Sequence, residues 1–310
     1  MQKKLSIDIL EDDILHNWKN VLSILLKDRT TNKNIIWATN DYCIYGMTYK
    51  AENEIKLKQI TGKNTNIIQP RIKKNKENQF NRMKEKAEVF TPSWICNKQN
   101  NLIDEKWFNK PNQFNIEDGE KWITNTAKIE FDKKGKWKDY ILNLRMEIAC
   151  GEAPYIVSRY DTVTGKIIPV EDRIGLLDRK LRVINENVDD EAKWIKWVKK
   201  AYKSIYAFEY QGDNLLLARE NLLYTFIENY WYKFYKIPLE KDIKRIAQII
   251  SWNVWQMDGI KYIVPFCDKD TLYKQMSFFI NIPFNVNYCK IKDWTKSKNN
   301  VIEYRDLIGG

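Results

Sequence analysis

The segment from Arg145 to Val157 constrains the fold more than any other part of the sequence. An apolar run containing Glu147 leads into a tight turn of small residues at Gly151, and a second apolar run follows at residues 155–157. A buried strand that turns at a glycine into a helix points backbone N–H groups at whatever lies over the carboxyl end of the strand. Open α/β sheets bind cofactors at that edge, so the segment predicts a cofactor site.

The length and composition predict a globular protein. The chain has 310 residues, of which 44% are hydrophobic, enough for one large domain or two small ones. Its longest wholly apolar runs are a few residues, far short of the roughly 20 needed to span a bilayer. The first 15 residues alternate charges with leucine and isoleucine, unlike a signal peptide. We therefore expect a cytoplasmic protein with no membrane association.

Cysteine and histidine usage argues against several classes of site. The five cysteines are odd in number and never spaced as Cys-x-x-Cys, and His16 is the only histidine. Neither a disulfide framework nor a zinc site is predicted, and we expect no metal. A Ser-His or Cys-His hydrolase would need His16, which falls in the amphipathic helix expected at residues 6–27, so nucleophilic hydrolysis is disfavoured.

The net charge of +11 and the pI near 9.1 favour a polyanionic partner such as nucleic acid. A lysine-rich composition can also reflect an AT-rich genome. The most basic stretch, residues 69–86, contains Lys73, Lys74 and Lys76 and is a candidate phosphate-contacting arm or helix. The alternative for this stretch is a solvated face that joins two elements.

Coarse patterning divides the chain at residue 86. Residues 1–86 are expected to form a helical and strand region with the basic arm, including a buried strand at residues 35–39. Residues 87–310 are expected to form the main domain, with an insertion of short strands at about 105–143. Asp41, Glu54 and Lys56 have the order of a metal-nuclease constellation, but a solvated strand edge explains them as well.

Several segments resemble motifs of the DNA amino-methyltransferases of restriction-modification systems. Glu147-Ile-Ala-Cys-Gly-Glu-Ala153 resembles their first motif, which holds the methionine end of S-adenosylmethionine, although isoleucine replaces a proline and Ala153 replaces a glycine. Phe-Thr-Pro at residues 90–92 is similar to their tenth motif, which precedes the first in the gamma arrangement. The resemblance implies cofactor contacts from Phe90, Thr91, Pro92, Glu147, Ala149, Cys150 and Gly151. Independently, Thr91 is expected to cap a helix with Pro92 at its first position.

The second and third cofactor motifs follow in family order. Ile205-Tyr-Ala-Phe-Glu209 resembles the strand whose terminal acid accepts hydrogen bonds from ribose hydroxyls, and Asp213 is expected to cap the next helix. Residues 249–260 resemble the strand ending in an acid that takes the adenine amino group, which assigns Asp258 there. Trp252 or Trp255 is a candidate to flank the adenine ring, with core packing as the alternative.

Residues 278–284 end in Asn281-Ile-Pro283-Phe284, similar to the family's catalytic Asn-Pro-Pro-Phe loop. The resemblance implies that Asn281 holds the target amino group and Phe284 stacks on a flipped base. Asn40-Asp-Tyr42 is a fainter match that lacks both prolines, and a turn capping a strand end is the alternative. The later strands and the DNA-reading domain of the family are not visible after Phe284.

The sequence thus predicts an α/β fold with a Rossmann-like, mostly parallel sheet and helices on both faces, resembling gamma-class DNA adenine methyltransferases. The implied function is transfer of a methyl group from S-adenosylmethionine to an exocyclic amino group of adenine in DNA, within restriction-modification or phage defence. The first alternative is a non-catalytic, cofactor-binding subunit completed by a second chain that supplies target recognition or nuclease activity. The second is the metal-dependent nuclease.

Overall fold

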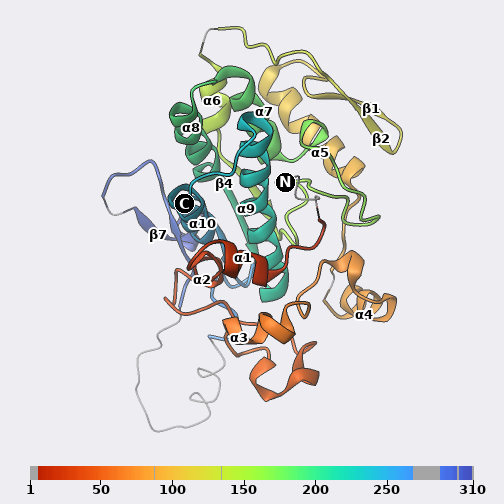
Figure 1. The fold of residues 1–310 in the computed structure, drawn as a ribbon, viewed down its shortest axis with the longest axis vertical. Helices are drawn as coiled ribbons and strands as arrows, with labels where there is room; N and C mark the ends of the chain where they lie inside the picture. Colours follow the sequence, from red (N-terminus) through yellow and green to blue (C-terminus); the bar gives the residue numbers. More distant parts are fainter. Residues whose placement is uncertain (1–5, 87, 134, 268–286, 299, 309–310) are drawn as a thin grey trace.

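The computed structural model describes residues 6–86, 88–133, 135–267, 287–298 and 300–308. Within these ranges the chain forms ten α-helices and three small β-sheets, one of them parallel (Figure 1). The expected α/β class is confirmed at this level. None of the helices in the described ranges combines the length and the apolar character needed to cross a bilayer.

The parallel sheet has three strands in the order β3-β4-β5: β3 (Arg145–Ile148), β4 (Ile205–Glu209) and β5 (Val254–Gln256). In register, Glu147 lies opposite Ala207, and Glu209 lies opposite Gln256. β4 ends at Glu209, as the sequence predicts. β5 is shorter than expected because residues 249–253 complete the preceding helix.

Helices connect the parallel strands. α7 (Leu176–Asn187) and α8 (Glu191–Lys203) lie between β3 and β4, and α9 (Gly212–Phe234) and α10 (Glu240–Asn253) lie between β4 and β5. Both crossovers step in the same direction along the sheet. Because such crossovers are almost always right-handed, both place their helices on the same face.

The two faces of the sheet have different coverings. Ile205, Ala207 and Val254 pack in the main core with the helices. Phe208 and Trp255 point the other way and pack with the antiparallel pair of β6 (Lys290–Lys292) and β7 (Val301–Glu303). The expectation of helices on both faces is therefore wrong for the described residues, because a hairpin covers the second face.

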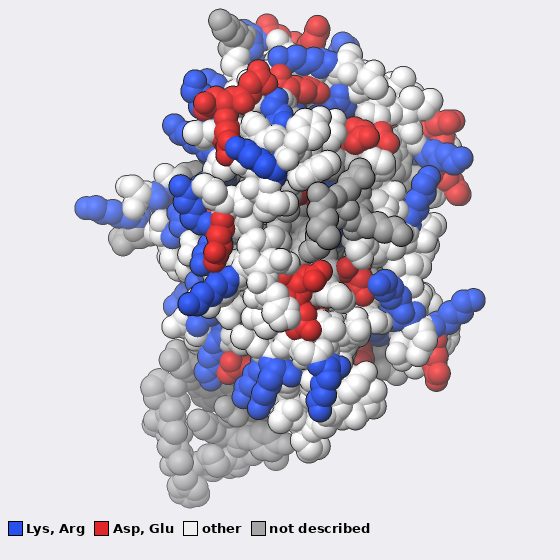
Figure 2. Space-filling model, viewed as in Figure 1, with Lys and Arg blue, Asp and Glu red and all other residues white. Residues whose placement is uncertain are grey.

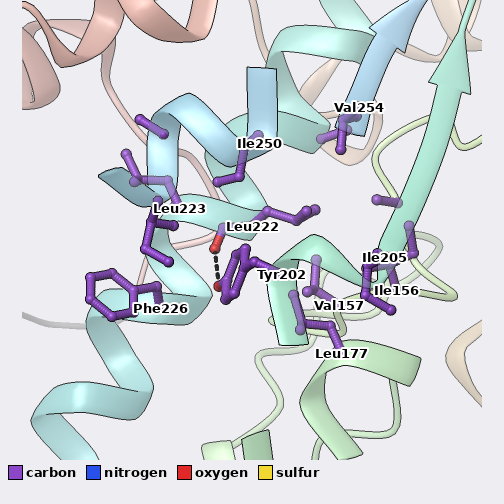
Figure 3. Packing of buried hydrophobic residues seen from close by; sticks show 14 of the residues in the cluster. Ile156, Val157, Leu177, Tyr202, Ile205, Leu222, Leu223, Phe226, Ile250 and Val254 are labelled. Atoms are coloured by element: carbon purple, nitrogen blue, oxygen red, sulfur yellow. Dashed lines mark hydrogen bonds between the residues drawn. The ribbon is translucent and has the colours of Figure 1, made fainter. Parts of the chain in front are cut away.

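The main core lies between the sheet and helices α7 to α10. Figure 3 shows Tyr202 among Leu222, Leu223 and Phe226, and its hydroxyl donates to the carbonyl oxygen of Leu222 at 2.7 Å. This bond satisfies the one polar group that the buried phenol brings into the core. The same core includes buried residues from both sides of the expected boundary at residue 86, among them Leu22 and Leu223.

The N-terminal region departs from its predicted elements. Residues 6–27 form two short helices, α1 (Glu11–Asn17) and α2 (Val21–Leu26), rather than one. The break falls at Asn20, which has φ of 66° and so adopts the left-handed conformation that asparagine tolerates. Residues 35–39 form no strand, since only an isolated bridge joins Ile36 to Glu54.

The remaining elements are short, apart from the helix that follows Pro92. They are α3 (Leu57–Ile60), α4 (Lys76–Lys86), α5 (Ser93–Phe108), β1 (Asn115–Asp118), β2 (Lys121–Thr124) and α6 (Trp137–Leu142). Short 3-10 helices occupy Cys43–Tyr45, Met47–Tyr49, Gly62–Asn64, Arg71–Lys73, Val170–Asp172 and Tyr304–Leu307. Residues 105–143, expected to form short strands, contain the β1–β2 hairpin together with the end of α5 and with α6.

Candidate cofactor-binding site

The ends of β3 and β4 are joined by two hydrogen bonds. The N–H of Cys150 donates to the carbonyl oxygen of Phe208 at 2.9 Å, and the N–H of Gly151 donates to Oε2 of Glu209 at 2.8 Å. The small-residue turn after β3 therefore lies directly against the acid that ends β4. These are two of the segments that the sequence predicts to share a site.

Glu209 is buried and bonded on both carboxylate oxygens. In addition to Gly151, the N–H groups of Tyr210 and Gln211 donate to Oε1 at 3.0 and 3.1 Å. Burial raises the pKa of Glu209, and these backbone donors oppose the rise. A carboxylate has about four acceptor positions, so the three backbone bonds leave room for one further donor.

Glu147 is a second buried carboxylate at the same edge. Its Oε1 accepts a long hydrogen bond from the N–H of Tyr155, at 3.4 Å, and its Oε2 has no hydrogen-bond partner within the described residues. Burial raises the pKa of Glu147 well above its ordinary value, and the charge of Glu209 raises it further. Among the described residues, no basic side chain forms an ion pair with either carboxylate.

Phe90 completes the junction from a third segment. A Cβ added at Gly151 would lie 3.9 Å from Cζ of Phe90, so the aromatic ring lies over the glycine. The guanidinium of Arg71 lies 5.1 Å from the centre of the Phe90 ring, a cation–π contact. The sequence reasoning missed Arg71, and its only signal was membership in the basic stretch.

Thr91 and Pro92 follow Phe90 into α5. The carbonyl oxygen of Thr91 accepts the hydroxyl of Thr162 at 3.1 Å. Thr91 does not cap the helix as expected, and α5 begins at Ser93 with Pro92 at its N-cap position. The carboxylate of Asp161 takes the capping role instead by accepting the N–H of Ser93 at 2.7 Å.

The turn after β3 differs from the expected strand-turn-helix arrangement. Gly151 has φ of 52° and Ala153 has φ of 64°, so the alanine adopts a conformation that normally favours glycine. No α-helix follows directly, and the next one, α7, begins at Leu176. The helix expected directly after the β3 turn is therefore missing, because further turns follow Gly151 in its place.

The thiol and the small side chain in this turn have different environments. Ala149 is exposed, whereas Cys150 is buried. Burial raises the pKa of the Cys150 thiol well above its ordinary value, so it remains protonated at neutral pH. Cys150 is thus a packing residue rather than a nucleophile.

Asp258 lies two residues beyond β5. Its Oδ1 accepts the N–H groups of Ile260 and Lys261 at 2.9 and 3.0 Å, so this oxygen organises the turn that follows. The preceding residue, Met257, donates its N–H to the carbonyl oxygen of Glu209 at 3.0 Å. The structure thus places Asp258 near the end of β4 without a direct contact to the Glu209 carboxylate among the described hydrogen bonds.

The two tryptophans proposed for the adenine ring lie in different settings. Trp255 is buried in the second core cluster, which agrees with core packing. Trp252 is half-buried, with the charged groups of Arg29 and Lys292 at 5.7 and 5.5 Å from its ring. Asn281, Pro283 and Phe284, the predicted catalytic residues, lie outside the described residues.

Two of the three residues of the metal-nuclease alternative, Asp41 and Glu54, make other contacts, and Glu54 and Lys56 both line the groove described below. Asp41 forms an ion pair with Arg82 at 2.8 Å, and Glu54 accepts the N–H of Asn34 at 3.1 Å. In the part of the chain that the structure describes, no group of three histidine, cysteine or acidic side chains could hold a metal ion. Tyr42 is buried and donates to Asp213, in keeping with a structural turn.

The basic stretch is partly neutralised within the protein. Lys73 pairs with Asp8 at 3.0 Å and Lys74 pairs with Asp213 at 3.1 Å, the latter lysine being largely buried. The expectation that this stretch contacts phosphates therefore fails for Lys74. On the face shown in Figure 2, basic and acidic side chains are interspersed rather than gathered in one patch.

A groove of about 860 Å³ lies beside the carboxyl end of β5. Gln256 and Ile36 are among its lining residues, with Lys33, Lys56 and Lys58 and three acidic side chains. Neither Gly151 nor Glu209 lines it. The groove therefore lies along the same sheet edge as the buried carboxylates of Glu147 and Glu209 but does not contain them. These carboxylates point to a binding site more specifically than the groove does.

In comparisons with known proteins, no protein-family model, no curated protein and no solved structure matches this chain.

Proposed function

We propose that this protein binds S-adenosylmethionine at the carboxyl ends of β3 and β4 and transfers its methyl group to an exocyclic amino group of adenine in DNA. One observation carries the proposal: Phe90 lies over Gly151, and Gly151 donates to Glu209. Three segments that resemble separate methyltransferase motifs therefore meet at one sheet edge. Their convergence does not follow from local sequence pattern.

The strand order supports a Rossmann-like sheet as the finer description. Successive strands β3, β4 and β5 each add on the same side, which is the order of the first half of a doubly wound sheet. In such sheets the ligand lies outside the carboxyl ends of the strands, beginning at the first strand of the half. Gly151 occupies that position here.

The electrostatics of the edge suit a cationic ligand. Glu147 and Glu209 are buried with raised pKa values, and neither has an ion-pair partner among the described side chains. S-adenosylmethionine, when bound, supplies a methyl group on a positively charged sulfur and carries an ammonium group. Glu147, with its unpartnered Oε2, would accept from the ammonium, and the last acceptor position of Glu209 would take a ribose hydroxyl.

On the acceptor side, the assignment rests on sequence resemblance. Asn281 would hold the target amino group in line with the methyl group, and Phe284 would stack on the base. Positioning does most of the chemical work, since the amino nitrogen loses its proton only after attack. DNA is the proposed partner, in restriction-modification or phage defence, in keeping with the net charge of +11.

Calorimetric titration with S-adenosylmethionine tests the binding step. Glu147→Gln keeps the shape of the side chain but removes its charge, and we expect it to weaken binding by about 1 to 3 kcal/mol. Glu186→Gln is the control, because Glu186 pairs with Arg182 on α7. No heat with wild-type protein at millimolar ligand would remove the proposal.

The pH dependence of binding gives a second readout. Burial favours the protonated form of Glu147 in the free protein, whereas a cationic ligand favours the carboxylate. Binding should therefore release protons and strengthen as the pH rises through the raised pKa of Glu147. Titrations in buffers of different ionisation enthalpy measure this release, and its absence would show that Glu147 is not in the site.

Transfer of tritium from labelled cofactor to mixed-sequence DNA tests the chemistry. Asn281→Ala should abolish transfer and leave cofactor affinity unchanged. Activity that appears only after a cell extract is added would favour the alternative of a cofactor-binding subunit that needs a second chain. Activity that survives the substitution would move the acceptor loop elsewhere.

A further inference from the structure

Arg82, on α4, is the centre of a buried polar network. The Arg82 side chain is 4% exposed and reaches four other side chains. Its Nε donates to Glu88 at 2.7 Å, and its two terminal nitrogens lie 3.0 and 3.2 Å from the two oxygens of Asp213. It also donates to Gln211 at 2.6 Å and to Asp41 at 2.8 Å.

The partners of Arg82 lie on both sides of the candidate site. Glu88 is two residues before Phe90, whose ring lies over Gly151. Gln211 is two residues after Glu209, and its N–H donates to the Glu209 carboxylate at 3.1 Å. Arg82 therefore links the segment that carries Phe90 to the turn whose N–H groups bond the Glu209 carboxylate.

Additional bonds fix the same junction. Lys74 and the hydroxyl of Tyr42 both reach Oδ2 of Asp213, at 3.1 and 2.7 Å. The amide of Asn214 donates to the Glu88 oxygen that Arg82 also uses, at 3.0 Å. The charges of Arg82 and Lys74 hold the pKa of Asp213 well below its ordinary range, so this carboxylate remains ionised despite complete burial.

The chemistry of the network favours positioning over simple stability. A buried ion pair often adds little stability compared with apolar residues of the same volume, because removing charges from water is costly. The planar guanidinium, in contrast, fixes the directions of several acceptors at once, which a lysine does not do. Four acceptors from three separate segments need that geometry.

We propose that Arg82 is a positioning residue that holds Phe90 over Gly151 and orients Glu209, and thereby sets ligand affinity without touching the ligand. This inference rests on the proposed function, because the ligand is the cationic cofactor assigned to that edge. It also makes α4 part of the binding apparatus rather than a DNA-contacting arm.

Arg82→Met tests the inference against a matched control, Arg179→Met. Arg179 is also buried and pairs with Asp104 at 2.7 Å, and its other side-chain hydrogen bonds go to Asn97 and Asn101 on α5 rather than to Glu88 or Gln211. S-adenosylmethionine affinity would be measured by calorimetry at a temperature at which urea titration shows each variant to be folded. We expect Arg82→Met to weaken binding about tenfold, which falls within the range of coupling energies between neighbouring residues. Arg179→Met should change the affinity by no more than about twofold from wild type.

A double-mutant cycle with Phe90→Ala measures the coupling between Arg82 and Phe90 in ligand binding, which a purely structural role of Arg82 would not produce. If Arg82 acts through Phe90, the alanine substitution should weaken binding in the wild type but have little further effect beside Arg82→Met. Arg82→Lys keeps the charge but loses the planar guanidinium, and it is the variant to use if Arg82→Met does not fold. It should also weaken binding. Unchanged affinity in the folded Arg82 variants, or fully additive effects, would overturn the inference.

Hydrogen exchange of the peptide spanning residues 70–92 separates this inference from the proposed function. Exchange there should accelerate in the Arg82 variants and not in Arg179→Met. If the wild type binds no cofactor, the proposed function fails, and faster exchange confined to the Arg82 variants would still support the positioning of Phe90. Equal exchange in all variants would overturn it.

Discussion

Two buried carboxyl groups should make the protein less stable as the pH rises. Glu11, the first residue of α1, is 1% exposed, and Glu220, in α9, is fully buried. In the part of the chain that the structure describes, Oε2 of Glu11 and both oxygens of Glu220 have no hydrogen-bond partner. Burial raises the pKa of Glu11 to about 9 and that of Glu220 well above its ordinary value, and the nearby Asp8 adds to both effects.

The magnitude follows from proton linkage. In the unfolded chain, Glu11 titrates near 4.5, whereas the folded protein keeps its proton until about pH 9. Below the unfolded pKa both states are protonated and there is no penalty. Above it the free energy of unfolding falls by about 1.4 kcal/mol per pH unit, which amounts to roughly 3 kcal/mol at neutral pH. The loss is complete once pH passes the folded pKa.

Glu11→Gln removes this penalty while keeping the shape of the side chain. Urea unfolding should show the variant more stable than wild type by about 2 to 3 kcal/mol at neutral pH, with little difference near pH 4.5. Glu186→Gln serves again as the control, since Glu186 is paired with Arg182. A variant that is less stable than wild type at neutral pH, or a constant difference across pH, would refute the reasoning.

Three further predictions concern contacts away from these acids. Gly212→Ala should destabilise the fold by about 1 to 3 kcal/mol in urea, because the added Cβ would lie 2.0 Å from the carbonyl oxygen of Ile36; unchanged stability would contradict this contact. Asp213→Asn should cost about 3 to 5 kcal/mol because it removes the buried charge that pairs with both Arg82 and Lys74, and wild-type stability should fall as acid protonates Asp213; urea unfolding measures both effects. Ile148→Thr should change the thermal midpoint little, because Ile148 is 66% exposed at the end of β3, and a large loss would show that this side chain is covered.

Local pattern determined several elements of this protein. The apolar run closed by an acid predicted that β4 ends at Glu209. The small-residue turn placed Gly151 at a strand end. These features depend on residues close in the chain, whose periodicity is visible without a fold.

The sequence was wrong where a distant partner decided the local conformation. Asp213 is not the helix cap that its type suggested, because Arg82 and Lys74 draw its carboxylate into a buried network. Thr91 does not cap α5, because Asp161 reaches the first N–H group of that helix instead. Local preferences of about 1 kcal/mol give way to such charge-assisted contacts.

For the candidate site, the sequence by itself determined which acids and small residues stand at the ends of strands. Only the tertiary structure decided that Phe90 lies over Gly151, that Gly151 binds Glu209, and that Glu147 remains without a counter-charge among the described side chains. Strand order and crossover direction set these distances, and both depend on contacts between residues far apart in the chain. The charge of a basic stretch is likewise visible in sequence, but whether Lys74 faces solvent or a buried carboxylate is fixed only when the segment before α4 packs against the start of α9.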